Sequence, residues 1–358
     1  MVEHGTVFGN QLCRHGCGYR RWNDHLDRQR DTFGIQCRSY ALVPTRAGKY
    51  RSLKGDVCVV GGKVTPPEQL AMKHISEVHP SASARLFRAM RWLDRFRGWR
   101  RIARIAPSEA AFTVVNGSVA HTGTFASKLD REVYLFGSYE ADFIRVFLDF
   151  IPSERRGVAL DIGANVGTHS MAFTSRFAAV HAFEPNERLW KTFERNVALN
   201  ELENVHLHRV GLAESAADLP FFDIGRDNLG LGTFSTIEQY DRPLQQVGVF
   251  RVERGDDYLE AKGISTVDAI KIDVQGFEPH VLIGLNKTLA KSKPVVWIEI
   301  GGGTFEDLSS LRRVQELFPY PIKMHRLAQP EGVVRRLTIE PVVSQQLKRG
   351  NYLISPLD

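Results

Sequence analysis

A short strand that breaks into a glycine-rich turn is the first part of this sequence able to bind a ligand. Residues 158–170 read VALDIGANVGTHS, in which Asp161 follows an apolar run and precedes two glycines. Gly163 lets the turn bend and lets the backbone approach a ligand, and Gly167 lets the next helix begin close to the sheet. In a doubly wound sheet, ligands bind at the end of such a strand. We therefore expect a cofactor site formed by Asp161, Gly163, Asn165 and Gly167.

The end of the next strand indicates which kind of cofactor binds. Glu184 follows Gly167 by seventeen residues, and a carboxylate in this place can accept hydrogen bonds from both hydroxyls of a ribose. The dinucleotide pattern GxGxxG would need glycines where Asn165 and Thr168 stand, and bulk there keeps a pyrophosphate away. S-adenosylmethionine has no phosphate and presents an ammonium group, which Asp161 can meet directly or through water. S-adenosylmethionine is therefore the predicted cofactor, and an NAD-dependent oxidoreductase is the alternative.

A second acidic cluster ends the strand that should neighbour this turn. Residues 268–278 read DAIKIDVQGFE, a strand that ends in acids and a glycine just before a helix. In this type of sheet the fourth strand ends beside the first, so Asp273 should lie opposite the Asp161 turn. A hydroxyl becomes a good nucleophile for methyl transfer only when a base takes its proton. Asp273 is the first candidate for this base, and the alternatives are Glu278, Glu299 and His169, which could equally be a packed residue of the first helix.

Several of these side chains also have an ordinary structural explanation. Asp161 could cap the turn that follows it, and Glu184 could be a surface acid. Glu278 stands in the first turn of a helix, where its charge complements the helix dipole. Lys271 lies two positions before Asp273 on the same strand face, so the two could form a structural ion pair.

Apolar runs separated by glycine and proline predict alternating strands and helices around the two clusters. The expected order is strand 157–161, helix 166–176, strand 179–183, helix 187–199, strand 204–209, strand 268–273, helix 277–290, strand 294–300, helix 305–317 and strands near 321–326 and 350–355. Alternation of this kind forms a parallel sheet with right-handed crossovers. The predicted fold class is α/β, a Rossmann-like doubly wound sheet. Residues 212–266 interrupt the alternation and are expected to form an inserted hairpin and loops over the cleft.

The N-terminal part has a different composition. Residues 1–80 show no sustained periodicity and are expected to be a basic, poorly ordered extension. Eight arginines stand against two acids between 81 and 110, and apolar residues recur three or four apart over 82–105. This pattern predicts a basic amphipathic helix that either packs on its own domain or contacts a membrane surface. A hairpin turning at 116–117 and a lead-in helix 140–150 complete the segment 81–150 ahead of a catalytic domain 151–358.

Charge, cysteine usage and hydropathy argue against several functions. The net charge is +6, but the basic excess lies in the N-terminal arm, so no specific nucleic-acid surface is predicted. All four cysteines fall in the first sixty residues, and the CxxxC spacing of Cys13 and Cys17 has no second ligand pair, so no metal site is predicted. The sequence has neither an apolar run of about 18 residues nor the apolar stretch of a secretory signal, which predicts a cytoplasmic protein.

At these residues the sequence resembles the FkbM-like methyltransferase family, a branch of the class I S-adenosylmethionine-dependent enzymes. The matching pieces are 161–167 with His169-Ser170, Phe183-Glu184-Pro185, Asn196, Asn200 and 271–278. The resemblance runs from about residue 110 to 356. It implies a seven-stranded sheet whose last strand is antiparallel, and O-methylation of a small molecule, sugar or glycolipid.

Two further points follow from the resemblance. Residues 137–140, Gly-Ser-Tyr-Glu, are similar to the family's stretch ahead of the first strand, which closes over the cofactor. Gln275 is a departure, because the family more often has glutamate there, and a change of substrate or weakened activity is implied. A non-catalytic cofactor-binding module is therefore a second alternative function.

Overall fold

The computed structural model describes residues 37–44, 50–60, 63–65, 111–116, 119–125, 127–223, 232–235, 244–301, 307–328 and 337–357. Their contacts divide the chain into two units, Met1–Glu77 and Val78–Asp358. The second unit contains the sheet and the cleft on which the function depends.

The first unit contains a small antiparallel sheet. Its strands are β1 (Cys37–Pro44), β2 (Tyr50–Val60) and β3 (Lys63–Thr65), in the order β1-β2-β3. The sequence did not predict these strands, because the apolar runs here are short and are interrupted by glycine and polar residues. The remainder of the extension 1–80 and the amphipathic segment 82–105 lie outside the described residues.

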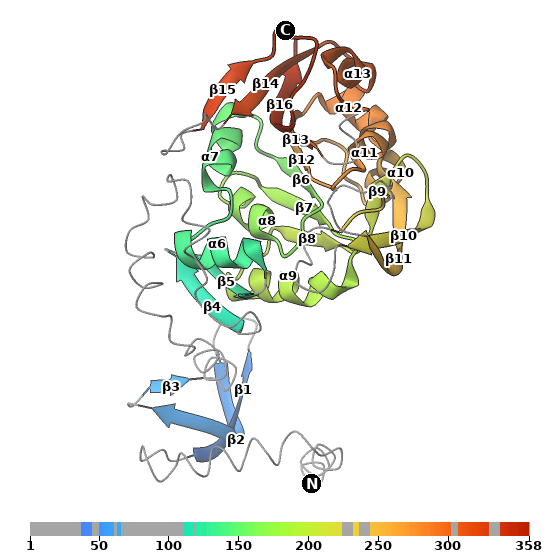
Figure 1. Ribbon diagram of the computed structural model, residues 1–358. Helices are drawn as coiled ribbons and strands as arrows, with labels where there is room; N and C mark the ends of the chain where they lie inside the picture. The colour runs from blue at the N-terminus through green and yellow to red at the C-terminus, as the bar shows by residue number, and fades with distance from the viewer. Residues whose placement is uncertain are drawn as a thin grey trace. The chain divides into compact units, whose positions relative to one another are not determined.

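An eight-stranded sheet in the order β15-β14-β16-β13-β12-β6-β7-β8 forms the centre of the second unit (Figure 1). Five neighbouring strands are parallel: β13 (Val295–Ile300), β12 (Ala269–Ile272), β6 (Val158–Ile162), β7 (Ala179–Phe183) and β8 (Val205–His208). β16 (Gly350–Pro356) is antiparallel to both β13 and β14 (Ile322–Ala328). The doubly wound sheet with an antiparallel last strand is confirmed. The strand β15 (Thr338–Pro341) adds an edge that the sequence analysis did not predict.

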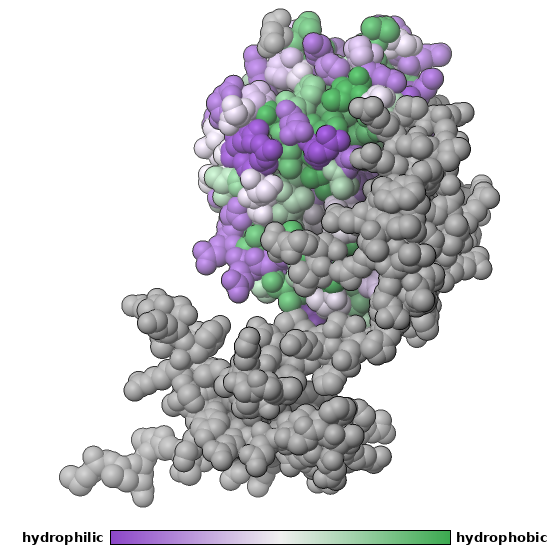
Figure 2. All heavy atoms as spheres, turned by 90° about the vertical axis from the view of Figure 1, so that its left-hand side faces the viewer, coloured by the Kyte–Doolittle hydropathy of each residue, from purple (hydrophilic) through white to green (hydrophobic). Residues whose placement is uncertain are grey.

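Helices cover both faces of this sheet. One face carries α7 (Ala141–Phe150), α8 (Thr168–Phe173) and α9 (Glu187–Leu199), and the other carries α10 (Gly255–Ala261), α11 (Glu278–Gly284), α12 (Asn286–Ser292) and α13 (Leu311–Glu316). Phe147 of α7 and Phe173 of α8 pack in one cluster with Trp297 of β13. Leu282 of α11 packs in the opposite cluster with Ile298, the next residue of β13. Successive strand residues thus serve opposite layers, as the pleat requires. Figure 2 shows the side that carries α7, where apolar side chains lie between polar ones.

A hairpin attaches to the outer surface of α9. β4 (Ala111–Asn116) pairs antiparallel with β5 (Val119–Thr124), and α6 (Lys128–Phe136) follows. Asn196 of α9 accepts the Thr122 backbone N–H at 2.8 Å through Oδ1, and Asn200 accepts that of Ala120 at 2.7 Å. The two asparagines therefore bind the edge of β5.

A second small sheet occupies much of the region 212–266. It contains β9 (Gly211–Ala213), β10 (Ala217–Asp223) and β11 (Gln245–Arg254) in the order β10-β11-β9. β10 and β11 form an antiparallel hairpin, and β11 continues in parallel beside β9.

Three predicted helices differ from the observed ones. Helix 166–176 ends at Phe173, helix 305–317 is helical only over Leu311–Glu316 among its described residues, and helix 277–290 is divided into α11 and α12. The division has a physical cause in α10. The buried carboxylate of Asp256 accepts the backbone N–H groups of Lys287 and Thr288 at 2.8 Å each, so it caps α12 as a separate helix.

Candidate active site

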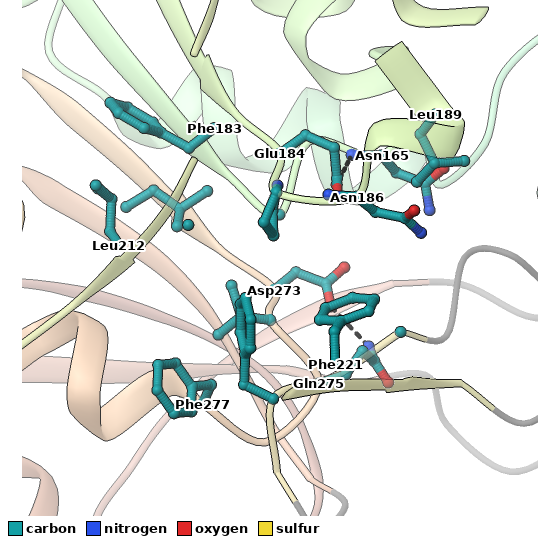
Figure 3. Close-up of a pocket in the computed structure, with 17 residues that line it drawn as sticks. Asn165, Phe183, Glu184, Asn186, Leu189, Leu212, Phe221, Asp273, Gln275 and Phe277 are labelled. Atoms are coloured by element: carbon teal, nitrogen blue, oxygen red, sulfur yellow. Dashed lines mark hydrogen bonds between the residues drawn. The ribbon is translucent and has the colours of Figure 1, made fainter. Parts of the chain in front are cut away.

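A cleft lies at the carboxyl ends of β6, β7 and β12, where a ligand was expected (Figure 3). It contains about 540 Å³ of empty space, part of it open to solvent. Glu184 and Asp273 lie on opposite sides of the cleft. The lining residues are Ile162, Gly163, Asn165, Phe183, Glu184, Pro185, Asn186, Leu189, Gly211, Leu212, Phe221, Gly232, Phe234, Asp273, Val274, Gln275 and Phe277.

Gly163 brings the turn after β6 against the end of β12. Its φ is +82°, and a Cβ atom there would lie 1.9 Å from the carbonyl oxygen of Asp273. Its backbone N–H donates to the carbonyl of Phe183 at 3.0 Å. Only glycine fits this position. The nearest group to Gly163 is thus the backbone carbonyl of Asp273, directly after β12. The sequence predicted instead that this glycine would allow the backbone to approach a ligand.

Glu184 holds the same turn from the end of β7. Its Oε2 accepts the backbone N–H of Asn165 at 2.9 Å, and its Oε1 accepts that of Asn186 at 2.8 Å. Burial raises the pKa of Glu184 to about 7, although these two hydrogen bonds oppose the shift. Each carboxylate oxygen has a second lone pair, so Glu184 can still accept the hydroxyls of a ribose.

Asp161 and Gly167 lie behind the cleft and do not line it. Asp161 is fully buried, accepts a 2.6 Å hydrogen bond from the Ser170 hydroxyl and lies 3.7 Å from the Lys271 ammonium. Gly167, at φ +86°, is the N-cap of α8, and a Cβ atom there would lie 2.9 Å from the ring of Phe193. These residues position the turn from inside the protein.

Asp273 has both a structural partner and access to the cleft. Lys271 Nζ lies 3.3 Å from its Oδ2, and the Gln275 amide donates to its Oδ1 at 2.7 Å. Burial alone would raise the pKa of Asp273, but Lys271, Gln275 and His169 outweigh burial and hold this pKa below its ordinary value. Asp273 is therefore an ionised carboxylate at the cleft, and the predicted ion pair with Lys271 coexists with that position.

Glu299 of β13 completes this acidic group. It accepts a 3.3 Å hydrogen bond from the same Gln275 amide that binds Asp273. The negative charge of Asp273, together with burial, raises the pKa of Glu299 to about 8. Two neighbouring carboxylates thus differ in protonation at neutral pH, a condition typical of acid–base sites.

His169 is a buried residue beneath the cofactor turn. Its Nε2 lies 3.2 Å from Glu140 Oε2, and its ring packs in a T-shaped arrangement with the rings of Trp297 and Tyr139 at centroid distances of 5.2 and 6.0 Å. It does not line the cleft. Tyr139 and Glu140, in the segment 137–140, therefore pack on α8 through His169.

Glu278 caps the turn that carries Gln275. Both of its carboxylate oxygens accept the backbone N–H of Gly276 at 3.1 Å, and Oε1 also accepts that of Val274 at 3.3 Å. Its side chain is buried and does not line the cleft. Its structural role is thus to bind the backbone N–H groups of the turn after β12. The sequence had suggested that its charge complements the helix dipole instead.

Sequence reasoning missed the residues that the inserted region contributes. Thr233 Oγ1 donates to the backbone carbonyl of Gln275 at 2.7 Å. The ring of Phe234 lies 4.9 Å from that of Phe221 and 5.4 Å from that of Phe277, which closes one wall of the cleft. The aromatic residues around the glycine-rich stretch of the insert were the available signal.

Asn186 is a second residue that the sequence analysis did not single out. Its Oδ1 accepts hydrogen bonds from the backbone and side chain of Arg188, at 3.2 and 3.1 Å, and Arg188 pairs with the buried Asp223 of β10 at 2.6 Å. Its buried Nδ2 has no hydrogen-bond partner among the described residues. This donor lies at the cleft beside Glu184, where a ligand can satisfy it.

The cleft fits S-adenosylmethionine better than a dinucleotide. Glu184 and the Asn186 amide suit a nucleoside, and the apolar side chains of Phe183 and Leu212 suit an adenine ring. The carboxylate of Asp273 suits the positive sulfonium end. Asn165, at φ +54°, occupies the turn where a pyrophosphate would need glycine.

Within the part of the chain that the structure describes, no helix is long and apolar enough to cross a membrane. Among the same residues, no group of three or more His, Cys, Asp or Glu side chains is arranged to hold a metal ion.

Several known proteins similar to this chain are named methyltransferases. Hexuronic acid methyltransferase AglP of Haloferax volcanii is 28% identical over 190 residues, which cover 52% of this chain and 73% of that protein. The 2-O-methyltransferase NoeI of Sinorhizobium fredii is 26% identical over 174 residues, covering 45% and 71%. The crystal structure of methyltransferase FkbM from Methylobacillus flagellatus has 17% identity and a TM-score of 0.36, and the match covers 58% of this chain and 52% of that one.

The family comparison coincides with the cleft. Residues 161–320 match the family model described as the methyltransferase FkbM domain. That stretch begins at Asp161 and includes Glu184, Asp273 and Glu299. The resemblance to the FkbM-like methyltransferases is thus confirmed, and with it methyl transfer as the class of reaction.

Proposed function

We propose that the protein transfers the methyl group of S-adenosylmethionine to a hydroxyl of a small-molecule or glycan acceptor. The observation that carries the proposal is the position of Asp273, an ionised carboxylate that faces Glu184 across the cleft at the strand ends. An O-methyl acceptor needs a base at this place, because an alkyl hydroxyl is a poor nucleophile until it loses its proton.

Glu184 would hold the ribose, and Asn165 and Gly163 would shape the turn that supports the cofactor. When bound, S-adenosylmethionine supplies a methyl group on a positively charged sulfur. Asp273 then orients the acceptor hydroxyl and takes its proton as the hydroxyl oxygen forms its bond to the methyl carbon. Lys271 keeps Asp273 ionised and fixed in position through the 3.3 Å contact.

A sugar hydroxyl is the acceptor class that the relatives favour. One relative is named a hexuronic acid methyltransferase, and hexuronic acids are sugar acids; another is named a 2-O-methyltransferase, which specifies an oxygen as its acceptor atom. The aromatic wall formed by Phe221, Phe234 and Phe277 suits the apolar face of such a ring.

The experiment combines binding with transfer. Calorimetric titration with S-adenosylmethionine, S-adenosylhomocysteine and NAD⁺ should show binding of the first two alone. Incubation with methyl-labelled S-adenosylmethionine and a panel of uronic acid and neutral glycosides should then label a glycoside. The label should resist the mild alkali that cleaves methyl esters, since an ether is stable. Binding of NAD⁺ alone would replace the proposal with the oxidoreductase. Cofactor binding with no transfer to glycosides or to a total metabolite extract would favour the non-catalytic module.

A further inference from the structure

The side-chain amide of Gln275 lies between two carboxylates from neighbouring strands. Its Nε2 is 2.7 Å from Oδ1 of Asp273 and 3.3 Å from Oε2 of Glu299. Asp273 follows β12 and Glu299 belongs to β13, and these strands pair in parallel. One amide group therefore donates a hydrogen bond to each carboxylate.

Gln275 is held in this position by its own backbone. Its φ is +52°, in the left-handed region that few side chains adopt without support. The hydroxyl of Thr233 binds its carbonyl at 2.7 Å, and Glu278 fixes the N–H groups of Val274 and Gly276 on either side. These three contacts thus hold the backbone from which the Gln275 amide reaches the two carboxylates.

The charges around the two carboxylates are unequal. Lys271 supports Asp273 from the side opposite the amide, at 3.3 Å from Oδ2. Glu299 instead meets the repulsion of Asp273 at close range. Two adjacent carboxylates repel each other when both are ionised. Such a pair therefore shares one proton, as other buried acid pairs do. The other titratable groups that act on the pair are Tyr139, Glu140, His169 and Glu278.

We propose that Gln275 is a positioning residue that holds Asp273 and Glu299 as one acid pair, which carries a single proton in the free enzyme and releases it when the positively charged methyl donor binds. The proposal rests on the proposed function, because it takes S-adenosylmethionine as the ligand of the cleft. A sulfonium cation beside the pair favours its doubly ionised form.

The proton balance of a turnover follows directly. The proton that leaves on cofactor binding goes to solvent. The acceptor hydroxyl then gives its proton to the doubly ionised pair, its oxygen bonds to the methyl carbon, and the carbon–sulfur bond breaks with its electrons on sulfur. The pair ends with one proton, as it began. Gln275 acts in this sequence through the two acids and does not touch the reacting atoms.

Calorimetry in buffers of different ionisation enthalpy measures this proton directly and needs no acceptor. At pH 7 wild type should release up to about one proton with S-adenosylmethionine and clearly less with S-adenosylhomocysteine, whose sulfur is uncharged. Glu299→Gln should bind the cofactor and release none. The exposed Glu316→Gln, on α13, is the matched control and should behave as wild type.

Gln275 itself is tested by two variants. Gln275→Met keeps the length and removes the donor, so the pH midpoint of proton release should rise by about one unit, because a lost hydrogen-bond donor disfavours the charged form. Gln275→Glu adds a third carboxylate and should raise that midpoint further. The exposed Gln246→Met, on β11, is the control for the substitution.

The outcomes separate the two proposals. Absence of cofactor binding in wild type would refute the proposed function. Binding in which both ligands release the same number of protons, or in which Glu299→Gln releases as many as wild type, would overturn the acid pair alone. If Gln275→Met does not fold, the Glu299→Gln result still decides. An unchanged midpoint in a folded Gln275→Met would remove Gln275 from the mechanism.

Discussion

Lys271 and Asp161 face each other across the pairing of β12 with β6, with Lys271 Nζ 3.7 Å from Asp161 Oδ1. Both side chains are almost completely buried. Burial alone would lower the pKa of Lys271, but Asp273 and Asp161 outweigh it and raise this pKa to about 12. One cation therefore lies within ion-pair distance of an acid from each of the two sequence clusters.

Replacement of Lys271 with methionine should strongly destabilise the protein. The change leaves two carboxylates without their cation, and loss of one partner of a buried ion pair costs about 3–5 kcal/mol. Urea unfolding of Lys271→Met at neutral pH measures the loss. Lys323→Met, at an exposed position of β14, should change the free energy of unfolding by less than about 0.5 kcal/mol. Equal stability of both variants would mean that Lys271 is not needed to compensate the acids.

Glu184→Ala should weaken S-adenosylmethionine binding by about 1.5–3 kcal/mol, because it removes charge-assisted hydrogen bonds to the ribose. The structure adds a second reason, since the same carboxylate holds the backbone of Asn165 and Asn186. Titration calorimetry measures the change, with the exposed Glu203→Ala as control. An affinity within twofold of wild type would remove Glu184 from the cofactor site.

The pH dependence of stability should reveal the same carboxylate. The folded pKa of Glu184 is about 7, above its ordinary value of 4.5, so folding favours the protonated form. Its stabilising contribution is full below pH 4.5 and is lost as the pH rises through 7. Relative to Glu184→Gln, the ligand-free wild type should therefore lose stability over this interval. Urea unfolding at a series of pH values measures the difference, and a constant difference would contradict the raised pKa.

Asp273→Asn should separate binding from chemistry. The variant keeps the shape of the side chain and removes its basicity, so the cofactor affinity should stay within a few-fold while methyl transfer slows by on the order of a hundredfold or more. Single-turnover transfer to the labelled glycoside measures the rate, and Asp257→Asn on the exposed side of α10 is the control. Lost affinity with retained chemistry would make Asp273 a cofactor residue and would direct the search for the base to Glu299.

Removal of residues 1–77 should leave a folded and cofactor-binding protein. These residues form a unit of their own, and the cleft is built entirely from the second unit. The melting temperature should stay within about 4 °C, equivalent to roughly 1 kcal/mol for a domain of this size. A truncated protein that aggregates or melts far lower would place the extension in the core.

The sequence predicted the central sheet well because its strands are short apolar runs bounded by turn residues. It could not predict the division of α11 from α12, since the cap comes from Asp256, thirty-one residues before Lys287 in the chain. The edge strand β15 depends on pairing with β14 and has no strong pattern of its own.

The candidate site was predictable in part because two of its acids stand at the ends of predicted strands. Glu184 and Asp273 stand at strand ends, whose common edge follows from the topology. The buried positions of His169 and Glu278 depend on side chains and turns brought in by folding, namely Trp297 and the Gly276 backbone. Thr233 lies in the irregular insert, and no periodic pattern there predicts that its hydroxyl binds the Gln275 carbonyl.

The hydrogen bond from Thr233 to the Gln275 carbonyl has a consequence for protein engineering. Loops that surround an acceptor are the usual targets when a new specificity is sought, because they vary freely on a constant scaffold. In this protein Thr233 of the insert also binds the backbone of the turn that carries Gln275, whose amide donates to Asp273. A replacement of residues 232–235 by a foreign sequence would have to keep a hydroxyl at position 233, because the turn that carries the Gln275 amide would otherwise lose this contact.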